Sequence, residues 1–571
     1  MGIKHFFIWF RKNYPDCIHT IQKNESNNID NLCIDMNGIY HACAQKVFEY
    51  GDHKPYRKRL LKKVKRTSLK WQKKLYSEIC EKINFYLKLI KPKKRLILCV
   101  DGVAGMAKMN QQRQRRFKTS MADDGDMDFN PINITPGTKF MNFLSKYIDW
   151  YIRIMMSHDN DWQNIEVVFS NENVAGEGEH KIINYIRKYS EINESYCIHG
   201  LDADLIMLTL GTLHPHMYIL RENHYNNNEK FLLDISNFGQ QLTNNMKWEK
   251  TETSRRFSTK SVIDDFIFMC FLVGNDFVPT IPTLAILEGG IDVMIDVYKK
   301  VCPVYGHLTR CTKDSNDNVI VLLRSQSIHI FLGQLSMNEK GLLEEKQSKK
   351  DNFFPDDILN KNTKYIQQKH VVDFENYKKD YYDYKFKDCS IENTCHEYLI
   401  GLQWVITYYK RGIPDWSWFY KHSYAPFLCD LSKYSEKFKY NSFTQNTPVN
   451  PYIQLLCVLP PKYVNLLPQP LQSIITSPQS SVYESYPETC KIDLSGKRRE
   501  WEGIVLLPNV DVEKIKKEYE NVEDNIDKRD MYRIQNTNHI SYKFVPRVSY
   551  LFKSFYGNIS DCHCKRKIIE F

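Results

Sequence analysis

Seven acidic residues occupy positions where carboxylates could bind metal ions. Some follow short apolar runs, and others form the pairs Glu-Gly-Glu and Asp-Ala-Asp, in which two carboxylates stand two residues apart. The seven are Asp35, Asp101, Glu177, Glu179, Asp202, Asp204 and Asp276. Ligand sets made only of oxygen favour Mg²⁺ or Mn²⁺ over zinc. Two such ions, about 3.5–4 Å apart, would activate a water and stabilise the leaving oxygen of a phosphodiester.

Bringing these carboxylates together without cations would be unfavourable. Two unit charges 4 Å apart repel by about 4 kcal/mol at an effective dielectric of about 20. Any one of these residues alone would more often be a helix cap or a turn residue. Capping does not readily explain seven of them at strand ends and helix starts, so the sequence predicts a metal site.

A basic helix is predicted directly after Asp101. Four of its side chains are spaced i, i+4, i+7 and i+8, which places them within an arc of about 100°: Lys108, Gln112, Arg115 and Arg116. The forked donors of Arg and the compact charge of Lys suit a terminal phosphate. A solvated basic face is the alternative, but the short link to Asp101 favours phosphate binding. A second basic run, residues 56–66, is interpreted as a solvated helix or general RNA-attracting surface, with nuclear import as a further alternative.

Apolar patterning predicts the elements that position these groups. Short buried strands are expected at 31–35, 95–101, 165–169 and 196–199, with amphipathic helices at 76–90, 139–156 and 180–189. This alternation predicts an α/β fold with a mostly parallel central sheet flanked by helices. In such sheets the functional crevice lies at the carboxyl ends of the strands, where Asp35 and Asp101 fall.

Composition restricts the class of protein. The 571 residues carry a net charge of +11 and 42% hydrophobic residues, which indicates a globular chain that could hold a polyanion. The sixteen cysteines are scattered, so free thiols in a reducing compartment are expected, and Cys562-His563-Cys564 is a weak zinc candidate. Neither a signal peptide nor an apolar run of about 18 residues is found, so a cytoplasmic protein is expected, with the nucleus as an alternative.

The motifs together resemble the Xrn/Rat-type 5′→3′ exoribonuclease family. The resemblance covers about residues 1–300 and 396–510. In the first part the matching segments are 1–10, 35–41, 100–104, 107–113, 134–138, 176–181, 200–206 and 271–277. In the second part they are 401–404, 416–418, 424–426, 455–461 and 500–505. We therefore predict a nuclease domain at 1–302, a variable linker or insertion at 303–395, a second region at 396–510 and a charged tail at 511–571.

The resemblance implies a PIN/flap-nuclease-like core wrapped by a second, largely helical region that completes the active site. It implies that the seven carboxylates bind two Mg²⁺ ions, which Mn²⁺ could replace, or support the residues that do. It also implies that Lys108, Gln112, Arg115 and Arg116 form a 5′-monophosphate pocket. His41 would stack on the first bases, although alone it would be interpreted as a core histidine, and Trp416, or alternatively Trp418, would close the stack.

The implied activity is processive degradation of 5′-monophosphorylated single-stranded RNA to nucleoside 5′-monophosphates in RNA decay. A monomer without membrane contact is expected, and its decapping or mRNA-decay partners cannot be specified. Gly105 and Met106 depart from the Pro and Arg usual in the family, and the long carboxy-terminal extension of large members is not seen. The amino-acid composition is rich in Asn, Lys, Ile and Tyr, which indicates a gene from an AT-rich genome, such as that of a large DNA virus or a protist.

Two rival functions use some of the same residues. A flap-type nuclease acting on DNA or RNA would carry a Gly-rich helical hairpin after the last acidic motif, and the residues after Asp276 do not have that pattern. A non-catalytic RNA-binding protein would be favoured by an incomplete carboxylate set, whereas all seven are present. The sequence therefore favours the exoribonuclease.

Overall fold

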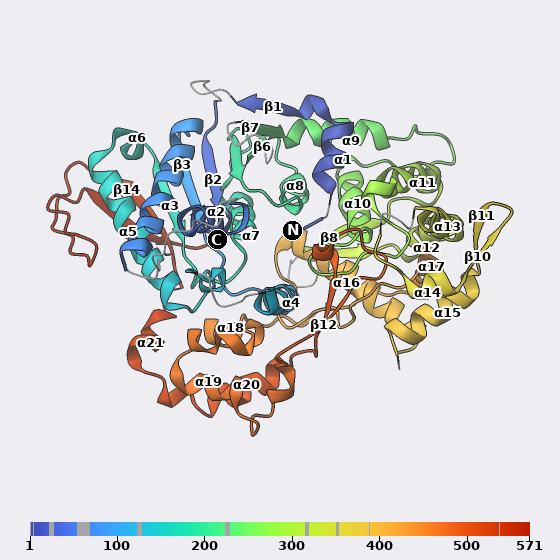
Figure 1. Cartoon of the computed structure of the whole chain (residues 1–571). Coiled ribbons are helices and arrows are strands. Elements are labelled where there is room, and N and C mark those ends of the chain that lie inside the picture. The colour runs from blue at the N-terminus through green and yellow to red at the C-terminus, as the bar shows by residue number, and fades with distance from the viewer. Residues whose placement is uncertain are drawn as a thin grey trace.

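The computed structural model describes residues 2–3, 5–21, 28–53, 69–122, 128–222, 229–313, 319–349, 353–387, 389–535 and 537–571. The basic run at 56–66 lies outside these residues. A nine-stranded sheet forms the centre of the fold (Figure 1). In sheet order its strands are β1 (Ile18–Ile21), β7 (Lys230–Asp234), β6 (Met217–Glu222), β5 (Tyr196–His199), β2 (Asn31–Asp35), β3 (Arg95–Cys99), β4 (Glu166–Ser170), β14 (His539–Phe544) and β15 (Cys564–Ile569).

The five central strands, β6 to β4 in that order, are parallel, and two antiparallel strands extend the sheet at each edge. The predicted strands 31–35 and 196–199 are β2 and β5 with the same bounds, and the other two predicted strands overlap β3 and β4. The prediction of an α/β fold with parallel strands at its centre is confirmed.

Alternate residues of the central strands face two separate cores. Leu32 and Ile34 of β2 pack with α2 (Met36–Phe48), α3 (Leu69–Ile90) and α5 (Lys139–His158), whereas Cys33 points to the other core. That second core contains α7 (Gly178–Tyr189), α8 (Asp204–Leu210), α9 (Ile235–Met246) and α10 (Thr259–Leu272). Since successive strand residues point to opposite faces, an apolar strand can be buried on both sides. The sheet is therefore a fixed support for the residues at its carboxyl edge.

Helices dominate the second half of the chain (Figure 1). Near the sheet lie α1 (Phe6–Asn13), α4 (Met106–Ala122) and α6 (Asn160–Gln163). The others are α11 (Gly290–Tyr305), α12 (Ser325–Ser336), α13 (Glu339–Ser348), α14 (Asp357–Lys361), α15 (Phe374–Lys385), α16 (Ile391–Arg411), α17 (Leu428–Ser435), α18 (Pro451–Val458), α19 (Gln469–Thr476), α20 (Val512–Glu520) and α21 (Lys528–Arg533). Helix α4 packs against α18 and shares a core with α19 and α20, so α4 joins the N-terminal half of the chain to the second region.

Two segments contain more regular structure than their polar composition indicated. Residues 303–395 include α12 to α15 and the hairpins β8 (Thr309–Lys313) with β9 (Val319–Leu323) and β10 (Thr363–Ile366) with β11 (Lys369–Val372). Residues 511–571 were expected to be a charged tail, yet they provide β14 and β15, and β14 pairs with β4 of the central sheet. The domain boundaries themselves stay predictions.

All sixteen cysteines are free thiols, and twelve of them are buried, in line with the expected reduced state. His563 hydrogen-bonds through Nδ1 to the carbonyl of Val548, 2.7 Å away, and the triplet at 562–564 does not form a metal-ligand cluster in the part of the chain described. Among the helices described, none combines the length and the apolar character of a membrane span.

Candidate metal and phosphate site

The carboxyl edge of the sheet brings the first acidic residues together. Asp35 is the last residue of β2, and its carboxylate accepts the N–H of Asn37 at 3.3 Å and caps α2. Asp101 follows β3 by two residues and accepts the N–H of Gly178 at 2.6 Å. A Cβ at position 178 would lie 2.7 Å from Asp35 Oδ1 and 3.3 Å from Asp101 Oδ1. The glycine of Glu-Gly-Glu is therefore required for this approach, because any larger residue would separate the carboxylates.

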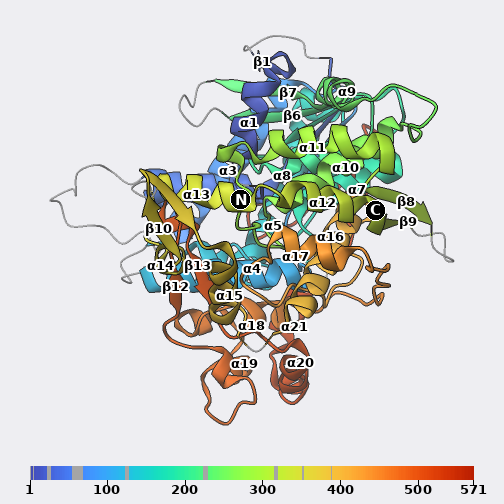
Figure 2. The same ribbon diagram turned by 90° about the vertical axis from the view of Figure 1, so that its right-hand side faces the viewer.

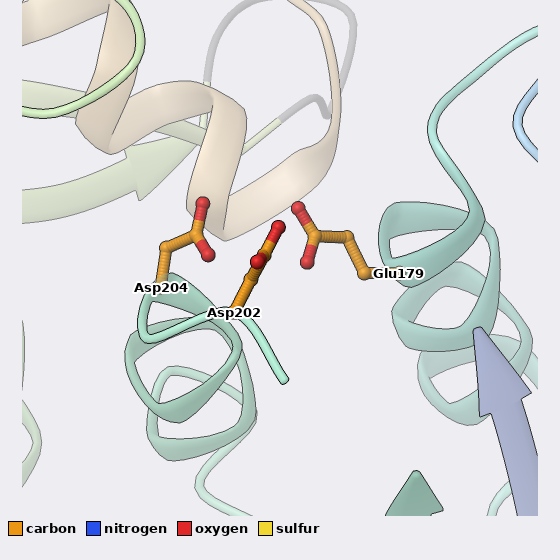
Figure 3. A group of neighbouring side chains, drawn as sticks. All are labelled: Glu179, Asp202 and Asp204. Atoms are coloured by element: carbon orange, nitrogen blue, oxygen red, sulfur yellow. The ribbon is translucent and has the colours of Figure 1, made fainter. Parts of the chain in front are cut away.

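Three further carboxylates converge beside them. Oxygens of Glu179, Asp202 and Asp204 all lie within 4.8 Å of one another. Asp202 lies in the loop before α8, Asp204 is the first residue of α8, and Glu179 lies at the start of α7. Figure 3 shows the side chains of Asp202 and Asp204 pointing toward Glu179. This is the one cluster of potential metal ligands in the part of the chain that the structure describes.

The cluster carries an excess of negative charge, which is only partly compensated by neighbouring cations. Burial and then Asp202 and Asp276 raise the pKa of Asp204 to about 7. Burial and then Asp204 and Glu177 raise the pKa of Glu179 well above its usual value. The pKa of Asp35 is also raised, by burial and then by Asp101 and Asp202. The carboxylates thus interact as one group, and a bound cation would lower all of these pKa values.

The residues present suit a divalent metal ion. Glu179 and Asp204 are 6% and 2% exposed, and the buried Oδ1 of Asp204 has no hydrogen-bond partner. A buried carboxylate oxygen without a donor costs free energy unless a cation takes the place of the donor. The donor set contains only carboxylate oxygen, which hard cations prefer. The chain therefore carries an acidic cluster that could hold metal.

Lys108 lies within the carboxylate cluster. Its Nζ is 2.6 Å from Glu177 Oε2 and 2.9 Å from Asp276 Oδ2. Although burial alone would raise the pKa of Asp276, Lys108 holds it below its usual value. Lys108 was expected in the phosphate pocket. It stands at the amino-terminal end of α4, two turns before the arginines, and there it neutralises two of the seven acids.

The other three predicted phosphate ligands lie further along α4. Arg116 is 7% exposed, and its Nη2 donates to Thr135 Oγ1 at 2.8 Å, whereas its buried Nη1 has no partner. Burial and the neighbouring Arg115 lower the pKa of Arg116 to about 9. The buried Oε1 of Gln112 likewise has no partner, while Arg115 is exposed. No ion pair of Arg116 with a carboxylate occurs among the described residues, so the structure described offers its charge no anion.

The aromatic candidates occupy different surroundings. His41 of α2 has its pKa lowered to about 4 by burial and then by Arg115 and Arg116, so its ring is neutral beside the two arginines. Trp418 stacks on Trp404, with ring centroids 4.9 Å apart, and its ring fits against Gly401. Trp416 accepts the N–H of Met106 through its carbonyl oxygen, which places this residue at the start of α4. Its ring is half-buried.

Two tyrosines of α16 reach the acidic cluster although the sequence analysis did not single them out. Tyr408 donates to Glu177 Oε1 at 2.8 Å, and Tyr409 lies 3.4 Å from Asp204 Oδ2. The N-terminal segment also takes part: the N–H of Gly2 donates to Asp276 Oδ1 at 3.1 Å. A Cβ at Gly2, where φ is +73°, would lie 2.5 Å from Asp204. The second region and the chain start therefore both contribute to the site, as a wrapped active site requires.

Comparison with known families agrees with this geometry. Residues 1–223 match the family described as "XRN 5′-3′ exonuclease N-terminus". Residues 256–376 and 372–570 match the "Xrn1 helical domain". The chain belongs to the XRN family. The family resemblance predicted from the motifs is therefore confirmed, and the matches extend over the segments 303–395 and 511–570, which the motifs did not cover.

Curated relatives of this XRN chain carry the names of exoribonucleases. It is 28% identical to 5′-3′ exoribonuclease 1 of Saccharomyces cerevisiae over 99% of its own length and 46% of that protein. It is 29% identical to human 5′-3′ exoribonuclease 1, covering 94% of this chain and 35% of the relative. It is 25% identical to 5′-3′ exoribonuclease 2 of Debaryomyces hansenii, over 100% of this chain and 74% of that protein. The chain spans less than half the length of the first two relatives.

Replacing Tyr408 with Phe is expected to weaken metal binding at this XRN site. The change removes the donor that orients Glu177 and leaves one of its buried oxygens unpaired, and supporting hydrogen bonds of this kind are worth about 10–100-fold in metal affinity. The Mg²⁺ concentration needed for half-maximal thermal stabilisation of the folded chain should rise by about that factor. Tyr398→Phe is the matched control, since Tyr398 is also buried on α16 but donates to the carbonyl of Pro279. An equal shift in both variants would contradict the role of Tyr408.

Glu172 is a buried acid at the end of β4 that stands apart from the cluster. It accepts a hydrogen bond from Ser145, and burial raises its pKa from 4.5 to about 7. Between these pH values the folded state binds more protons than the unfolded state, so the free energy of unfolding falls as pH rises, by about 3 kcal/mol in total. Glu172→Gln is expected to flatten the change in melting temperature between pH 5 and pH 8. If the melting temperature of Glu172→Gln depends on pH as that of the unmodified protein does, Glu172 is not the source of the pH dependence.

Proposed function

We propose that this chain is a 5′→3′ exoribonuclease that degrades 5′-monophosphorylated single-stranded RNA to nucleoside 5′-monophosphates. Its XRN membership and the names of its relatives support the proposal. The acidic cluster supports hydrolysis of a phosphodiester, and the buried Arg116 supports recognition of a phosphate.

The observation that carries the proposal is that one helix, α4, both contacts the acidic cluster and carries the buried Arg116. Lys108 touches the carboxylate cluster, and Arg116 stands eight residues later on α4, about 12 Å further along at 1.5 Å per residue. The start of the helix thus meets excess negative charge, and two turns later it carries a buried positive charge that pairs with no carboxylate among the described residues. A 5′-phosphate on Arg116 would place the following phosphodiester toward the carboxylates. Because a rigid helix fixes the separation, each cleavage would release a product of the same length.

Each set of side chains then has a separate role. The seven carboxylates would hold two Mg²⁺ ions, or Mn²⁺ in their place, and ions bound there supply an activated nucleophile and stabilise the leaving oxygen. Tyr408 and Tyr409 orient Glu177 and Asp204, and Lys108 compensates the charge of Glu177 and Asp276. Arg116, with Arg115 and Gln112, would hold the 5′-phosphate, whose extra charge an internal phosphodiester lacks.

Aromatic rings would hold the first bases without reading their identity. Bases offer π-faces regardless of sequence, so stacking suits an enzyme that degrades any RNA. The neutral ring of His41 beside the arginines supports a stacking role at the 5′ end. Trp416 is favoured for the other side of the stack, because the ring of Trp418 is already packed on Trp404 and Gly401.

The experiment that tests this proposal compares RNA ends. RNAs labelled at either end and bearing a 5′-phosphate, hydroxyl, triphosphate or cap are incubated with Mg²⁺ or with a chelator. The 5′-phosphate RNA should yield mononucleotides from the 5′ end with Mg²⁺ only. Internal cleavage products would support a flap-type nuclease instead, and binding without cleavage would support a non-catalytic protein. Action as a monomer in cytoplasmic RNA decay is part of the proposal, which chromatographic mass measurement and cell fractionation would check.

A further inference from the structure

An exposed tryptophan stands beside the site on a loop that is held from several sides. Trp501 is 57% exposed. It lies in residues 494–503, here called the rim loop, between β12 (Lys491–Asp493) and β13 (Ile504–Leu506). These two strands pair with each other and close the base of the loop. Figures 1 and 2 both place β12 near α4.

Hydrogen bonds hold the rim loop in one conformation. The carboxylate of Glu502 accepts the N–H groups of Arg498 and Arg499 at 2.9 and 3.1 Å. Phe354 and Lys497 are joined through their backbones at 2.7 Å, and the guanidinium of Arg498 bonds Glu288 at 3.1 Å. An aromatic ring on such a loop loses little conformational freedom when a ligand stacks on it.

The rim loop touches both elements that form the proposed active site. Lys118 of α4 donates to the carbonyl of Glu500 at 2.6 Å, and Lys118 stands less than one turn after Arg116. On the other side, His5 lies 3.7 Å from Glu502 Oε1, with its ring centroid 6.2 Å from that of Trp501. His5 follows Gly2, which abuts Asp204, by three residues. Trp501 therefore stands at the rim of the site.

The charge around Trp501 suits a polyanion. Lys497, Arg498 and Arg499 precede it on the loop, and Lys118 and the exposed Arg115 lie on the neighbouring helix. Glu500 and Glu502 oppose them, and Arg498 is paired with Glu288, but the carboxylate of Glu502 is occupied by backbone donors. Cations around an exposed aromatic ring are the arrangement used to hold single-stranded nucleic acid through phosphates and stacked bases.

We propose that Trp501 is a base-stacking platform for single-stranded RNA outside the catalytic site, on nucleotides 3′ of those held by His41 and Trp416. The proposal rests on the proposed exoribonuclease function. It extends the bound segment beyond the first few nucleotides, and Trp501 acts on substrate retention without contacting the reacting atoms. A protein partner docked on the same ring is the competing occupant, which the experiment below separates.

The test uses RNA length as its variable, in an Asp204→Asn background that prevents degradation. A 5′-phosphorylated 12-mer should bind Trp501→Ala about 5- to 100-fold more weakly, the range for loss of one stacked base. A 5′-phosphorylated trinucleotide should bind both proteins equally. Trp501→Phe should restore most of the affinity, and Tyr532→Ala, which removes a 69% exposed tyrosine on α21, is the control.

A fluorescent base locates the contact directly. 2-Aminopurine is placed at successive positions of the 12-mer. At one position beyond the third, its fluorescence should be quenched by the protein with Trp501 and not by the Trp501→Ala variant. Equal 12-mer affinity and identical quenching in the two proteins would overturn the inference and would leave a protein partner as the occupant of the ring. If the protein with Trp501 intact fails to prefer 5′-phosphorylated RNA, the proposed function fails instead, so the two failures are distinguishable.

Discussion

Asp204→Ala is expected to reduce RNA hydrolysis by about 10³-fold or more while RNA binding stays measurable. Asp204 is one of the three acids whose oxygens lie within 4.8 Å of one another, and its Oδ1 has no donor in the protein. Loss of a metal ligand removes several kcal/mol of transition-state stabilisation, and each 1.36 kcal/mol is a factor of ten in rate. Single-turnover cleavage of 5′-phosphorylated RNA measures the effect.

The same substitution is expected to raise thermal stability in a chelating buffer. Asp204 lies in the first turn of α8, where the helix dipole favours a carboxylate by about 0.3–1 kcal/mol. Burial and repulsion by Asp202 and Asp276 work against this and raise its pKa to about 7, a shift worth a few kcal/mol. Burial and repulsion together outweigh the helix dipole, so the alanine variant should melt at a higher temperature than the unmodified protein.

Divalent ions should reverse that order. Mg²⁺ that binds only the folded state should stabilise the unmodified protein by an amount that rises with the logarithm of its concentration above Kd, with a much smaller effect on the alanine variant. Asp234→Asn is the control, because Asp234 likewise stands at the start of a helix, but it ends strand β7 and caps α9 away from the cluster. Normal hydrolysis by Asp204→Ala, or a stability gain from Mg²⁺ equal to that of the unmodified protein, would exclude Asp204 as a ligand.

The central fold could be predicted because its signals are local. In β2 and β5, four buried residues follow one another, and the strands have the predicted bounds. Parallel neighbours then bring Asp35 and Asp101 to one edge of the sheet, a consequence of topology that the βα alternation already implies. The roles of the site residues themselves stay predictions.

Contacts between distant segments could not be predicted in the same way. Strand β15 contains Lys565, Arg566 and Lys567, all exposed, so no apolar alternation marks it as part of the sheet. Tyr408 and Glu177 are 231 residues apart, and a buried tyrosine in an apolar helix has the pattern of ordinary core. Helical spacing predicts that Lys108 and Arg116 share one face of α4. Spacing alone does not show that Lys108 contacts carboxylates while Arg116, among the described residues, does not.

Arg116→Ala is expected to remove the preference for a 5′-phosphate. Breaking a buried, hydrogen-bonded charge pair costs about 2–5 kcal/mol, so kcat/KM for 5′-phosphorylated RNA should fall by about 30-fold or more. Cleavage of 5′-hydroxyl RNA, which cannot use the pocket, should be nearly unchanged and provides the internal control. For 5′-phosphorylated RNA, the kcat/KM of Arg116→Lys should lie between that of the unmodified protein and that of Arg116→Ala, since lysine keeps the charge but loses the fork of donors.

Arg113→Ala separates phosphate binding from folding. Arg113 is also buried on α4, but its guanidinium donates to the carbonyl oxygens of Cys457 and Ser485. Its loss should lower stability and leave the ratio of phosphate to hydroxyl substrate intact. Arg116 should show the opposite pattern, because its buried Nη1 lacks an acceptor and its removal costs the free protein little. If Arg116→Ala lowers cleavage of both RNAs alike, Arg116 supports the fold and the 5′-phosphate is recognised elsewhere.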